Sequence, residues 1–445
     1  MQEIISAIST ASGTGGVAII RISGDDCLSL AKKMFRPIGK TKIEDFEPYK
    51  MYVGEIDGGN FTDFGMMVYF KGPKSYTGED MVEFHCHGGI AIQKGILKQT
   101  FNLGALPATR GEFTKRAFIN GKLSLDGAEG LISMINSESV ASVKLGYGLY
   151  REKLYAKVTA LQDALTFSLA SINADMDYPE EDLEELALTS VIECLKTTLL
   201  EVEKLISNYS SGRKIKDGIK VAIVGKPNTG KSSLLNAILN YDKAIVSSVA
   251  GTTRDVVEGS TEIEGVKFDF FDTAGIHESG DEIELAGIER SQKFLNSADV
   301  VILALDASKE FTEDDEKVIN WCQGKNVIKV YNKHDLGFVK EYDDGYVISA
   351  KTGEGIDNLK KALYSSAFSE GVDFNAEFIT EERHLRALEQ AKININEALL
   401  NIGVVPLDLI SEDIKKIWDN LGEITGQTAT EEIIDEIFAK FCVGK

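Results

Sequence analysis

Apolar and polar positions follow two different rhythms in the first half of this 445-residue chain. Up to about residue 120, short apolar runs such as Val17–Ile22 and Met66–Phe70 alternate with glycine turns, which predicts strands in a mixed α and β domain. From about residue 122 to 210, apolar residues recur at three- and four-residue steps, as at Leu195, Leu199 and Val202. This spacing predicts helices with one apolar face.

A third pattern begins near residue 215, where short apolar runs are separated by helix-like stretches. Continuous apolar runs are typical of strands buried on both faces of a parallel sheet. The runs predict five strands: Val221–Val224, Phe268–Phe271, Val300–Leu305, Val327–Val330 and Tyr346–Ile348. After about residue 368 the helical pattern returns.

These patterns together predict an α/β multidomain protein. We expect an N-terminal α+β domain at 1–120 and helical stretches at 121–214 and 368–445, which suggest one helical domain in two halves. An α/β domain with a mostly parallel sheet at 215–367 is inserted between the two halves.

The charge balance limits the partners that the chain binds by itself. It has 48 Lys and Arg against 70 Asp and Glu, a net charge of −22, so any contact with RNA is expected to be local or helped by a partner. The five scattered cysteines, without a Cys-x-x-Cys pair, are typical of a reducing compartment. No apolar run reaches the roughly 20 residues of a membrane helix. We therefore expect a soluble, cytoplasmic protein.

The stretch Gly225–Ser232 carries the strongest chemical signal. Its sequence, Gly-Lys-Pro-Asn-Thr-Gly-Lys-Ser, matches the phosphate-loop pattern GxxxxGK[ST] directly after a predicted strand. Backbone N–H groups and the following helix N-terminus favour a bound phosphate there. We expect Lys231 to bridge the β- and γ-phosphates and Ser232 to bind Mg²⁺. The expected nucleotide contacts of this stretch are Asn228, Thr229, Gly230, Lys231, Ser232 and Ser233.

Four further motifs follow in the order typical of a Ras-like P-loop GTPase. Thr253 is a candidate sensor of the γ-phosphate and Mg²⁺, and Gly275 is placed to donate its N–H to the γ-phosphate. Asp335 lies where guanine presents two hydrogen-bond donors that adenine lacks, so the nucleotide is expected to be GTP. The remaining expected GTP contacts are Ser247, Ser248, Val249, Ala250, Gly251, Thr252, Thr253, Asp272, Thr273, Ala274, Gly275, Asn332, Lys333, Asp335, Ser349, Ala350 and Lys351.

The residue types alone do not identify the group that orients the attacking water. Ras-type proteins carry a Gln after the switch glycine, but this chain has Ile276 there, which cannot hydrogen-bond to water. Four acids follow within a short stretch: Glu278, Asp281, Glu282 and Glu284. Asn228 is suited to bind a monovalent cation beside the phosphates, or it serves only as a turn residue. Both questions stay open at this level.

Two regions outside these motifs carry further unusual residues. His85 and His87 flank Cys86, but a metal site is not favoured because neighbouring residues of a strand point to opposite faces. Near the C-terminus, Thr430 is placed to cap a helix whose apolar face ends at Phe441. The following Cys442 is either a buried core cysteine or a functional thiol.

Five short sequences frame the GTPase motifs: Thr77–Asp80, His85–Gly89, Arg110–Phe113, Asn120–Leu123 and Phe441–Lys445. With those motifs, they resemble the tRNA uridine modification GTPase family called MnmE or TrmE, over essentially the whole chain. The resemblance implies that residues 1–120 bind tetrahydrofolate and form a homodimer. The implied folate contacts, to 5,10-methylene- or 5-formyl-tetrahydrofolate, are Arg21, Glu79, Lys122 and Lys445.

The resemblance also implies the reaction. With the flavoprotein MnmG (also GidA), in a heterotetramer, the family adds an aminomethyl or carboxymethylaminomethyl group to C5 of the wobble uridine of certain tRNAs. The one-carbon unit comes from the folate, and Cys442 is the required thiol. Because the chain is acidic, we expect the partner to supply most contacts with the tRNA.

For the inserted domain, the resemblance implies GTP hydrolysis stimulated by K⁺ when two such domains meet. Glu284 falls on the family's water-orienting acid, so Glu284, Lys231 and Cys442 are the expected catalytic residues. Ser232 and Thr253 are the expected Mg²⁺ ligands. The implied K⁺ ligands are Asn228, Ser247, Val249 and Thr252.

Two other classes of function compete with this one. A ribosome-assembly or RNA-chaperone GTPase is a switch without a modification reaction, but such a protein is expected to add a basic domain, which the acidic composition disfavours. A folate enzyme that is only regulated by its GTPase domain, and never meets RNA, stays open.

Overall fold

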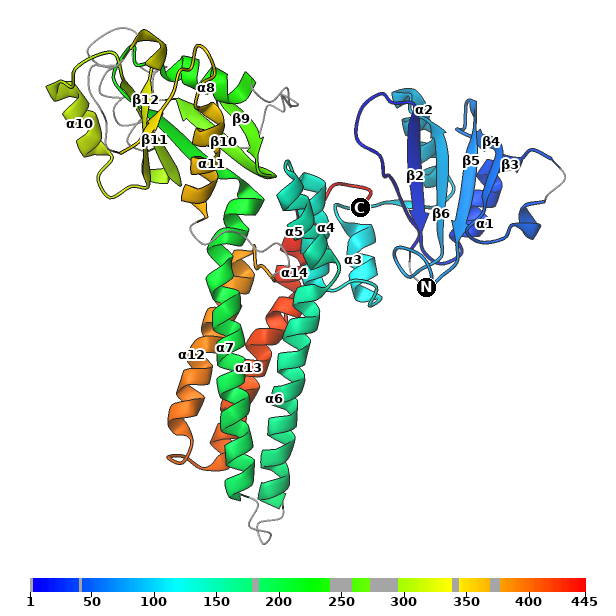
Figure 1. Ribbon diagram of the computed structural model, residues 1–445. Coiled ribbons are helices and arrows are strands. Elements are labelled where there is room, and N and C mark those ends of the chain that lie inside the picture. The colour runs from blue at the N-terminus through cyan, green and yellow to red at the C-terminus, as the bar shows by residue number, and fades with distance from the viewer. Residues whose placement is uncertain are drawn as a thin grey trace, which may run out of the picture. The chain divides into compact units, whose positions relative to one another are not determined.

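The computed structural model describes residues 3–39, 42–177, 184–240, 258–272, 295–337, 344–368 and 377–445. The chain divides into two compact units, each built from separate stretches of sequence. The first unit combines Met1–Ile132, Gly148–Val202 and Arg386–Lys445, and the second combines Ser133–Tyr147 and Glu203–Leu385. Among the described residues, each unit holds one β-sheet (Figure 1).

The sheet of the first unit has seven strands in the order β3-β4-β5-β6-β2-β1-β7. Neighbouring strands are antiparallel except for the parallel pair β1 and β7. The strands are β1 (Ile5–Ile8), β2 (Val17–Ser23), β3 (Phe35–Pro37), β4 (Met51–Asp57), β5 (Thr62–Phe70), β6 (Met81–His87) and β7 (Leu106–Pro107), and a short 3-10 helix spans Ile43–Asp45.

Helices α1 (Cys27–Met34) and α2 (Ile90–Asn102) cover one face of this sheet. They pack against fully buried residues of β2, among them Ile20 and Ile22. Because side chains alternate along a strand, Arg21 between these two residues lies on the opposite face. The sequence pattern of β2 thus places a cation on the side of the sheet away from the helices.

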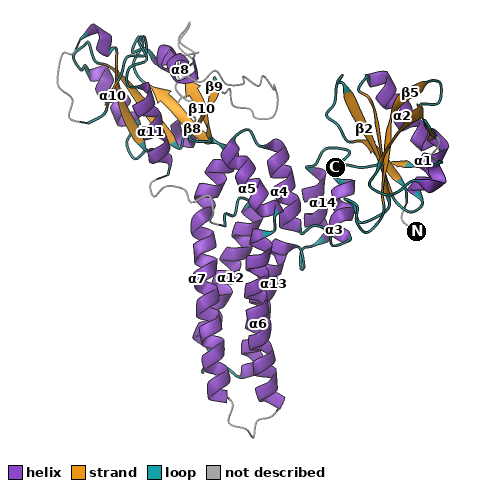
Figure 2. Ribbon diagram, turned by 45° about the vertical axis from the view of Figure 1, so that its right-hand side comes forward, coloured by secondary structure: helices purple, strands orange, loops and turns teal. Residues whose placement is uncertain are grey.

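The helical part of the first unit joins segments that are far apart in the sequence. Helices α6 (Lys153–Asp177), α7 (Glu184–Asp217), α12 (Glu382–Asn401) and α13 (Leu407–Thr425) run side by side in a bundle (Figures 1 and 2). The amide of Gln162 in α6 donates to the carbonyl of Trp418 in α13 at 3.2 Å. The chain therefore leaves this bundle to form the second sheet and then returns to complete it.

Three shorter helices lie mainly in the first unit: α3 (Glu112–Ile119), α4 (Leu125–Asn136) and the last helix α14 (Glu431–Ala439). Helix α5 (Val140–Tyr150) lies mainly in the second unit, where Ala141 and Leu145 join the apolar core. The hydroxyl of Thr430 caps α14 by accepting a hydrogen bond from the N–H of Ile433 at 3.4 Å. Phe438 and Phe441 are buried in one cluster with Leu125 of α4. The capped, amphipathic helix predicted near the C-terminus is present.

The sheet of the second unit has six strands in the order β13-β12-β11-β8-β10-β9, parallel except for the antiparallel pair β9 and β10. Apolar clusters lie on both faces, which explains why these strands read as continuous apolar runs. The predicted fold class is confirmed. The elements are β8 (Ile219–Val224), α8 (Lys231–Asn240), β9 (Gly259–Ile263), β10 (Val266–Asp272), β11 (Val300–Asp306), α10 (Glu313–Trp321), β12 (Val327–Asn332), a 3-10 turn (His334–Leu336), β13 (Tyr346–Val347) and α11 (Ile356–Ala367).

Candidate functional site

The predicted phosphate loop connects the end of β8 to the first residue of α8. Two of its glycines allow close backbone approach: a Cβ on Gly225 would lie 2.3 Å from the carbonyl oxygen of Ala304, and one on Gly230 would lie 2.4 Å from Asn332 Nδ2. Gly230 also has a φ of +87°, in the region that favours glycine. Substituting either glycine would displace the loop from its neighbouring strands.

Lys231 is buried and curves back over this loop. Its Nζ donates to the carbonyl oxygens of Gly225 and Lys226, both at 2.9 Å. Ser232 and Ser233 follow in the first turn of α8. The positive charge and the helix N-terminus therefore lie at the same point, as binding of a phosphate requires.

A cavity of about 690 Å³ lies beside the loop, at the carboxyl ends of the parallel strands. Asn332 joins its two sides, because its Nδ2 donates to the carbonyl of Thr229 and its Oδ1 accepts from the N–H of Ala350, both at 3.0 Å. Ser349 Oγ donates to Asp335 Oδ1 at 2.8 Å. The cavity lining includes Gly230, Ser233, Asn332, Lys333, Asp335, Ala350 and Lys351.

Lys333, which lies between Asn332 and Asp335 of the cavity, links these residues to the phosphate loop. Its Nζ donates to the carbonyl of Asn228 and to Asp306 Oδ2, the latter at 2.7 Å. Burial alone would raise the pKa of Asp306, but hydrogen bonds from Lys333 and Ser308 outweigh it and hold that pKa below its usual value. Asp306 was not among the predicted site residues, although an acid at the end of a strand of this sheet could have indicated it.

Lys226, the second residue of the phosphate loop, is anchored to the start of α10. Its Nζ forms an ion pair with Asp315 and donates to Thr312 Oγ1 at 2.8 Å. Asp315 also accepts from the N–H and hydroxyl of Thr312, at 2.9 and 3.1 Å, and so closes a capping box. The ion pair therefore ties the phosphate loop to the start of α10, a contact that the sequence pattern did not indicate.

We expect Lys226→Met to loosen the phosphate loop and to speed nucleotide dissociation several-fold. The variant leaves the buried carboxylate of Asp315 without its cation, at a cost of about 1–2 kcal/mol for a half-buried pair. The measurement is the dissociation rate of a fluorescent GDP. Lys317→Met is the control, because its ion pair with Asp314 on the same helix is exposed. Equal rates in the two variants would contradict this role for Lys226.

Several predicted site residues lie outside the described residues. They are Ser247, Ser248, Val249, Ala250, Gly251, Thr252, Thr253, Thr273, Ala274, Gly275 and Glu284. Asp272 is the last residue of β10.

A second site surrounds Arg21 on the first sheet. Its guanidinium forms an ion pair with Glu83, with Nη2 to Oε1 at 2.8 Å, and lies 5.2 Å from the ring centroid of Tyr76 and 5.6 Å from that of Phe113. Burial alone would raise the pKa of Glu83, but hydrogen bonds and charge from His85 and Arg21 outweigh it and keep that pKa low. Arg21 is thus fixed by a carboxylate and by two aromatic rings.

The C-terminal residues dock on this site. The carbonyl of Gly444 accepts from Ser9 Oγ at 3.0 Å and from Arg21 Nη1 at 3.3 Å. Burial, followed by the charge of Arg21, lowers the pKa of Lys445. Cys442 is exposed, so the alternative of a buried core cysteine is wrong.

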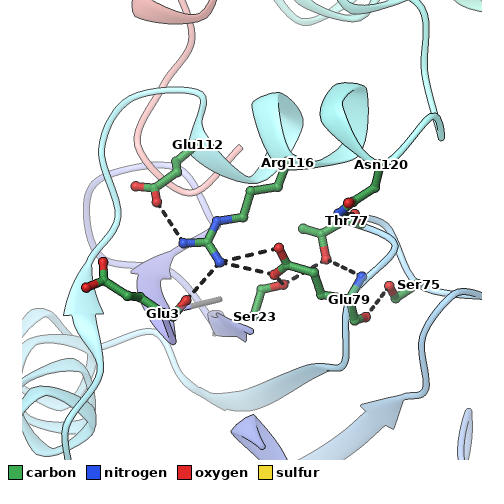
Figure 3. Close-up of polar contacts among 8 residues, drawn as sticks. All are labelled: Glu3, Ser23, Ser75, Thr77, Glu79, Glu112, Arg116 and Asn120. Carbon is green, nitrogen blue, oxygen red and sulfur yellow. Dashed lines mark hydrogen bonds and ion pairs between the residues drawn. The ribbon is translucent and has the colours of Figure 1, made fainter. Parts of the chain in front are cut away.

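Glu79 and Lys122 lie in adjoining loops beside Arg21's strand. Asn120 donates to the carbonyl of Thr77 at 2.7 Å, and a Cβ on Gly78 would lie 3.3 Å from Lys122 Cγ. Glu79 Oε2 accepts from Ser23 Oγ at 2.8 Å, and Arg116 forms an ion pair with it (Figure 3). Arg116, which lies one helical turn beyond Phe113, was not among the predicted site residues.

No metal-binding group of three or more His, Cys, Asp or Glu side chains occurs within the described parts of the chain. His85 contacts Glu83 on one face of β6, while Cys86 between the histidines is buried and His87 pairs with Asp63. The same parts contain no helix long and apolar enough to cross a membrane.

A phosphate loop, a base pocket with Asn332 and Asp335, and a mostly parallel sheet define the second unit as a P-loop GTPase domain. A family model described as MnmE helical domain matches residues 125–442, and one described as GTP-binding protein TrmE N-terminus matches residues 4–122. The chain belongs to the MnmE family of tRNA modification GTPases.

Curated relatives match over their full length. The tRNA modification GTPase MnmE of Clostridioides difficile is 37% identical over 457 residues, covering 100% of both chains. That of Thermoanaerobacter pseudethanolicus is 38% identical over 459 residues, covering 100% of this chain and 99% of the relative. Among solved structures, that of an Aquifex aeolicus Era variant bound to GDP.AlF4- is 32% identical with a TM-score of 0.28, covering 39% of this chain and 66% of its own.

Proposed function

We propose that this chain hydrolyses GTP to drive modification of C5 of the wobble uridine in certain tRNAs, together with the flavoprotein MnmG. Family membership supports tRNA modification. The observation that carries the finer proposal is the docking of the segment with Cys442 and Lys445 against Arg21 of the first sheet. An exposed thiol on the segment that also carries Lys445 and contacts Arg21 is a setting for group transfer, which a GTPase that only binds RNA does not need.

Tetrahydrofolate is the proposed one-carbon carrier, bound at Arg21, Glu79, Lys122 and Lys445. The side-chain chemistry suits this ligand: a pterin offers N–H donors to a carboxylate, and the glutamate tail offers carboxylates to cations. When bound, the folate supplies the carbon unit. The residues of the chain orient it, and Cys442 lies three residues before the proposed Lys445 contact.

For the GTPase domain we propose Mg²⁺ at Ser232 and Thr253 and K⁺ at Asn228, Ser247, Val249 and Thr252, with Glu284 orienting the attacking water. Asn228 supports this, because its φ of 64° and the bond from Lys333 to its carbonyl fix the loop at that point. K⁺ would supply positive charge beside the phosphates, because no arginine finger is expected there.

Hydrolysis is therefore expected to fall when NaCl replaces KCl at equal ionic strength. The measurement is phosphate release from GTP at saturating Mg²⁺, with GTP affinity recorded in both salts. Equal hydrolysis rates would remove K⁺ from the mechanism.

The proposed assembly is a homodimer through residues 1–120, with a helical domain at 121–214 and 368–445 and the GTPase domain at 215–367. MnmG completes a heterotetramer and supplies most tRNA contacts, which suits the net charge of −22 on this chain.

The test is nucleoside mass analysis of tRNA from cells that lack this chain, complemented with the wild type or with Cys442→Ser. The wobble C5 substituent should be lost on deletion, restored by the wild type and not by the variant, because the hydroxyl is a far weaker nucleophile than a thiolate. Unchanged nucleosides in the deletion strain would overturn the proposed function.

A further inference from the structure

Arg116 in α3 joins three acceptors that come from different parts of the first unit. Its Nη1 lies 3.1 Å from Glu79 Oε2 and 3.4 Å from Oε1, and it donates to the backbone carbonyl of Glu3 at 2.8 Å. Its Nη2 donates to Glu112 Oε1 at 3.0 Å (Figure 3). The planar guanidinium is fixed in orientation because its donors are directed at separate groups.

Glu112 is itself held in place. Burial alone would raise its pKa, but a hydrogen bond from the N–H of Thr109 and one from Arg116 keep that pKa low. The Thr109 N–H lies 2.7 Å from Glu112 Oε2. Arg116 therefore rests on a fixed carboxylate on one side while it contacts Glu79 on the other.

The backbone of Glu79 does not need Arg116 for its position. Its N–H donates to Thr77 Oγ1 at 3.2 Å, and its carbonyl accepts from Ser75 Oγ. The carboxylate of Glu79 does need a partner, because its side chain is only 4% exposed and a buried charge is unfavourable without an opposite charge beside it. Arg116 supplies that charge, and Ser23 fixes Oε2.

The two carboxylate oxygens of Glu79 accept different numbers of hydrogen bonds. Oε2 accepts from Ser23 at 2.8 Å and from Arg116 at 3.1 Å, whereas Oε1 takes the longer Arg116 contact at 3.4 Å. A carboxylate oxygen has room for two acceptor bonds. The arrangement therefore keeps capacity on Oε1 for a donor from a ligand.

We propose that Arg116 is a positioning residue for the pterin of the folate: through Glu79, it holds a charged carboxylate in the orientation that receives the ligand's paired N–H donors. This inference rests on the proposed folate function and adds to it a residue that does not touch the ligand.

The experiment is calorimetric titration of the full chain with 5-formyl-tetrahydrofolate. Arg116→Met should weaken binding about tenfold or more, since a misplaced carboxylate loses a charge-assisted hydrogen bond. Lys115→Met is the matched control. Lys115 is the neighbouring cation on α3, but it pairs with the exposed Asp435, so its variant should bind folate like the wild type.

A double-mutant cycle separates positioning from a general loss of structure. If Arg116 acts through Glu79, Arg116→Met should add no further loss to Glu79→Gln. Losses that add in full would overturn the proposal, as would wild-type affinity in Arg116→Met. Should that variant fail to fold, Arg116→Lys replaces it. A single ammonium cannot reach all three acceptors, so a several-fold loss that vanishes in Glu79→Gln is expected. A wild-type chain that binds no folate would instead overturn the proposed function.

Discussion

Asp335→Asn is expected to weaken GTP binding by about 10²-fold or more and to create affinity for xanthosine triphosphate. Guanine presents two N–H donors on one edge, and the Asp335 carboxylate can accept both. An amide keeps one acceptor and turns the other into a donor, which clashes with the guanine amino group. Xanthine has a carbonyl oxygen in place of that amino group and so suits the amide.

The hydrogen bond from Ser349 should survive in the Asp335→Asn variant, so the variant tests the contact with the base and not the stability of the pocket. The Ser349 hydroxyl donates to Asp335 Oδ1, and an amide oxygen can still accept that bond. The measurement is titration with fluorescent GTP and xanthosine triphosphate. Asp344→Asn is the control, because Asp344 is an exposed acid that pairs with Lys329. A loss of GTP affinity with no gain of affinity for xanthosine triphosphate would mean that Asp335 holds the pocket together and does not read the base.

Gly444→Ala is expected to abolish tRNA modification while the chain stays folded. The residue has a φ of +96°, and a Cβ there would lie 2.1 Å from the carbonyl oxygen of Ile8. The left-handed conformation costs a non-glycine residue about 1–2 kcal/mol, and the overlap forces the segment away from β1 as well. Cys442 and Lys445 would then leave the site at Arg21.

The measurement is again mass analysis of wobble nucleosides after complementation, with GTP affinity as the check of folding. Val443→Ala is the control, because that side chain is 51% exposed while its backbone pairs with Arg110. Full modification by Gly444→Ala would show that the docked position of the C-terminal segment has no part in the reaction.

The sequence was most informative where the chemistry is local. The phosphate loop lies in eight consecutive residues, and the strands before Gly225 and Asn332 are marked by apolar runs, so the GTPase domain and its fold class could be predicted. The base pocket follows because parallel strands bring their carboxyl ends to one edge of the sheet.

The contacts that could not be predicted join residues that are distant in sequence. Arg21 meets Gly444 across 423 positions, and Arg116 meets Glu79 across 37 positions, from a helix to a loop. Apolar periodicity identifies buried faces, but it does not specify which charged side chains meet at the edge of such a face. The exposure of Cys442 was undecided for the same reason, since it depends on how the segment after α14 docks.

The return of the chain to the helical bundle has a consequence for folding during synthesis. Gln162 of α6 and its partner Trp418 of α13 are 256 residues apart. At the ribosomal rate of about 5–20 residues per second, α6 waits on the order of ten to fifty seconds for this partner. The part of its apolar face that packs on α13 is exposed through that interval, while the intervening GTPase domain has time to fold as a unit and bring the two segments together. Variants that slow folding of the inserted domain are therefore expected to aggregate through the bundle, at a distance from the substitution itself.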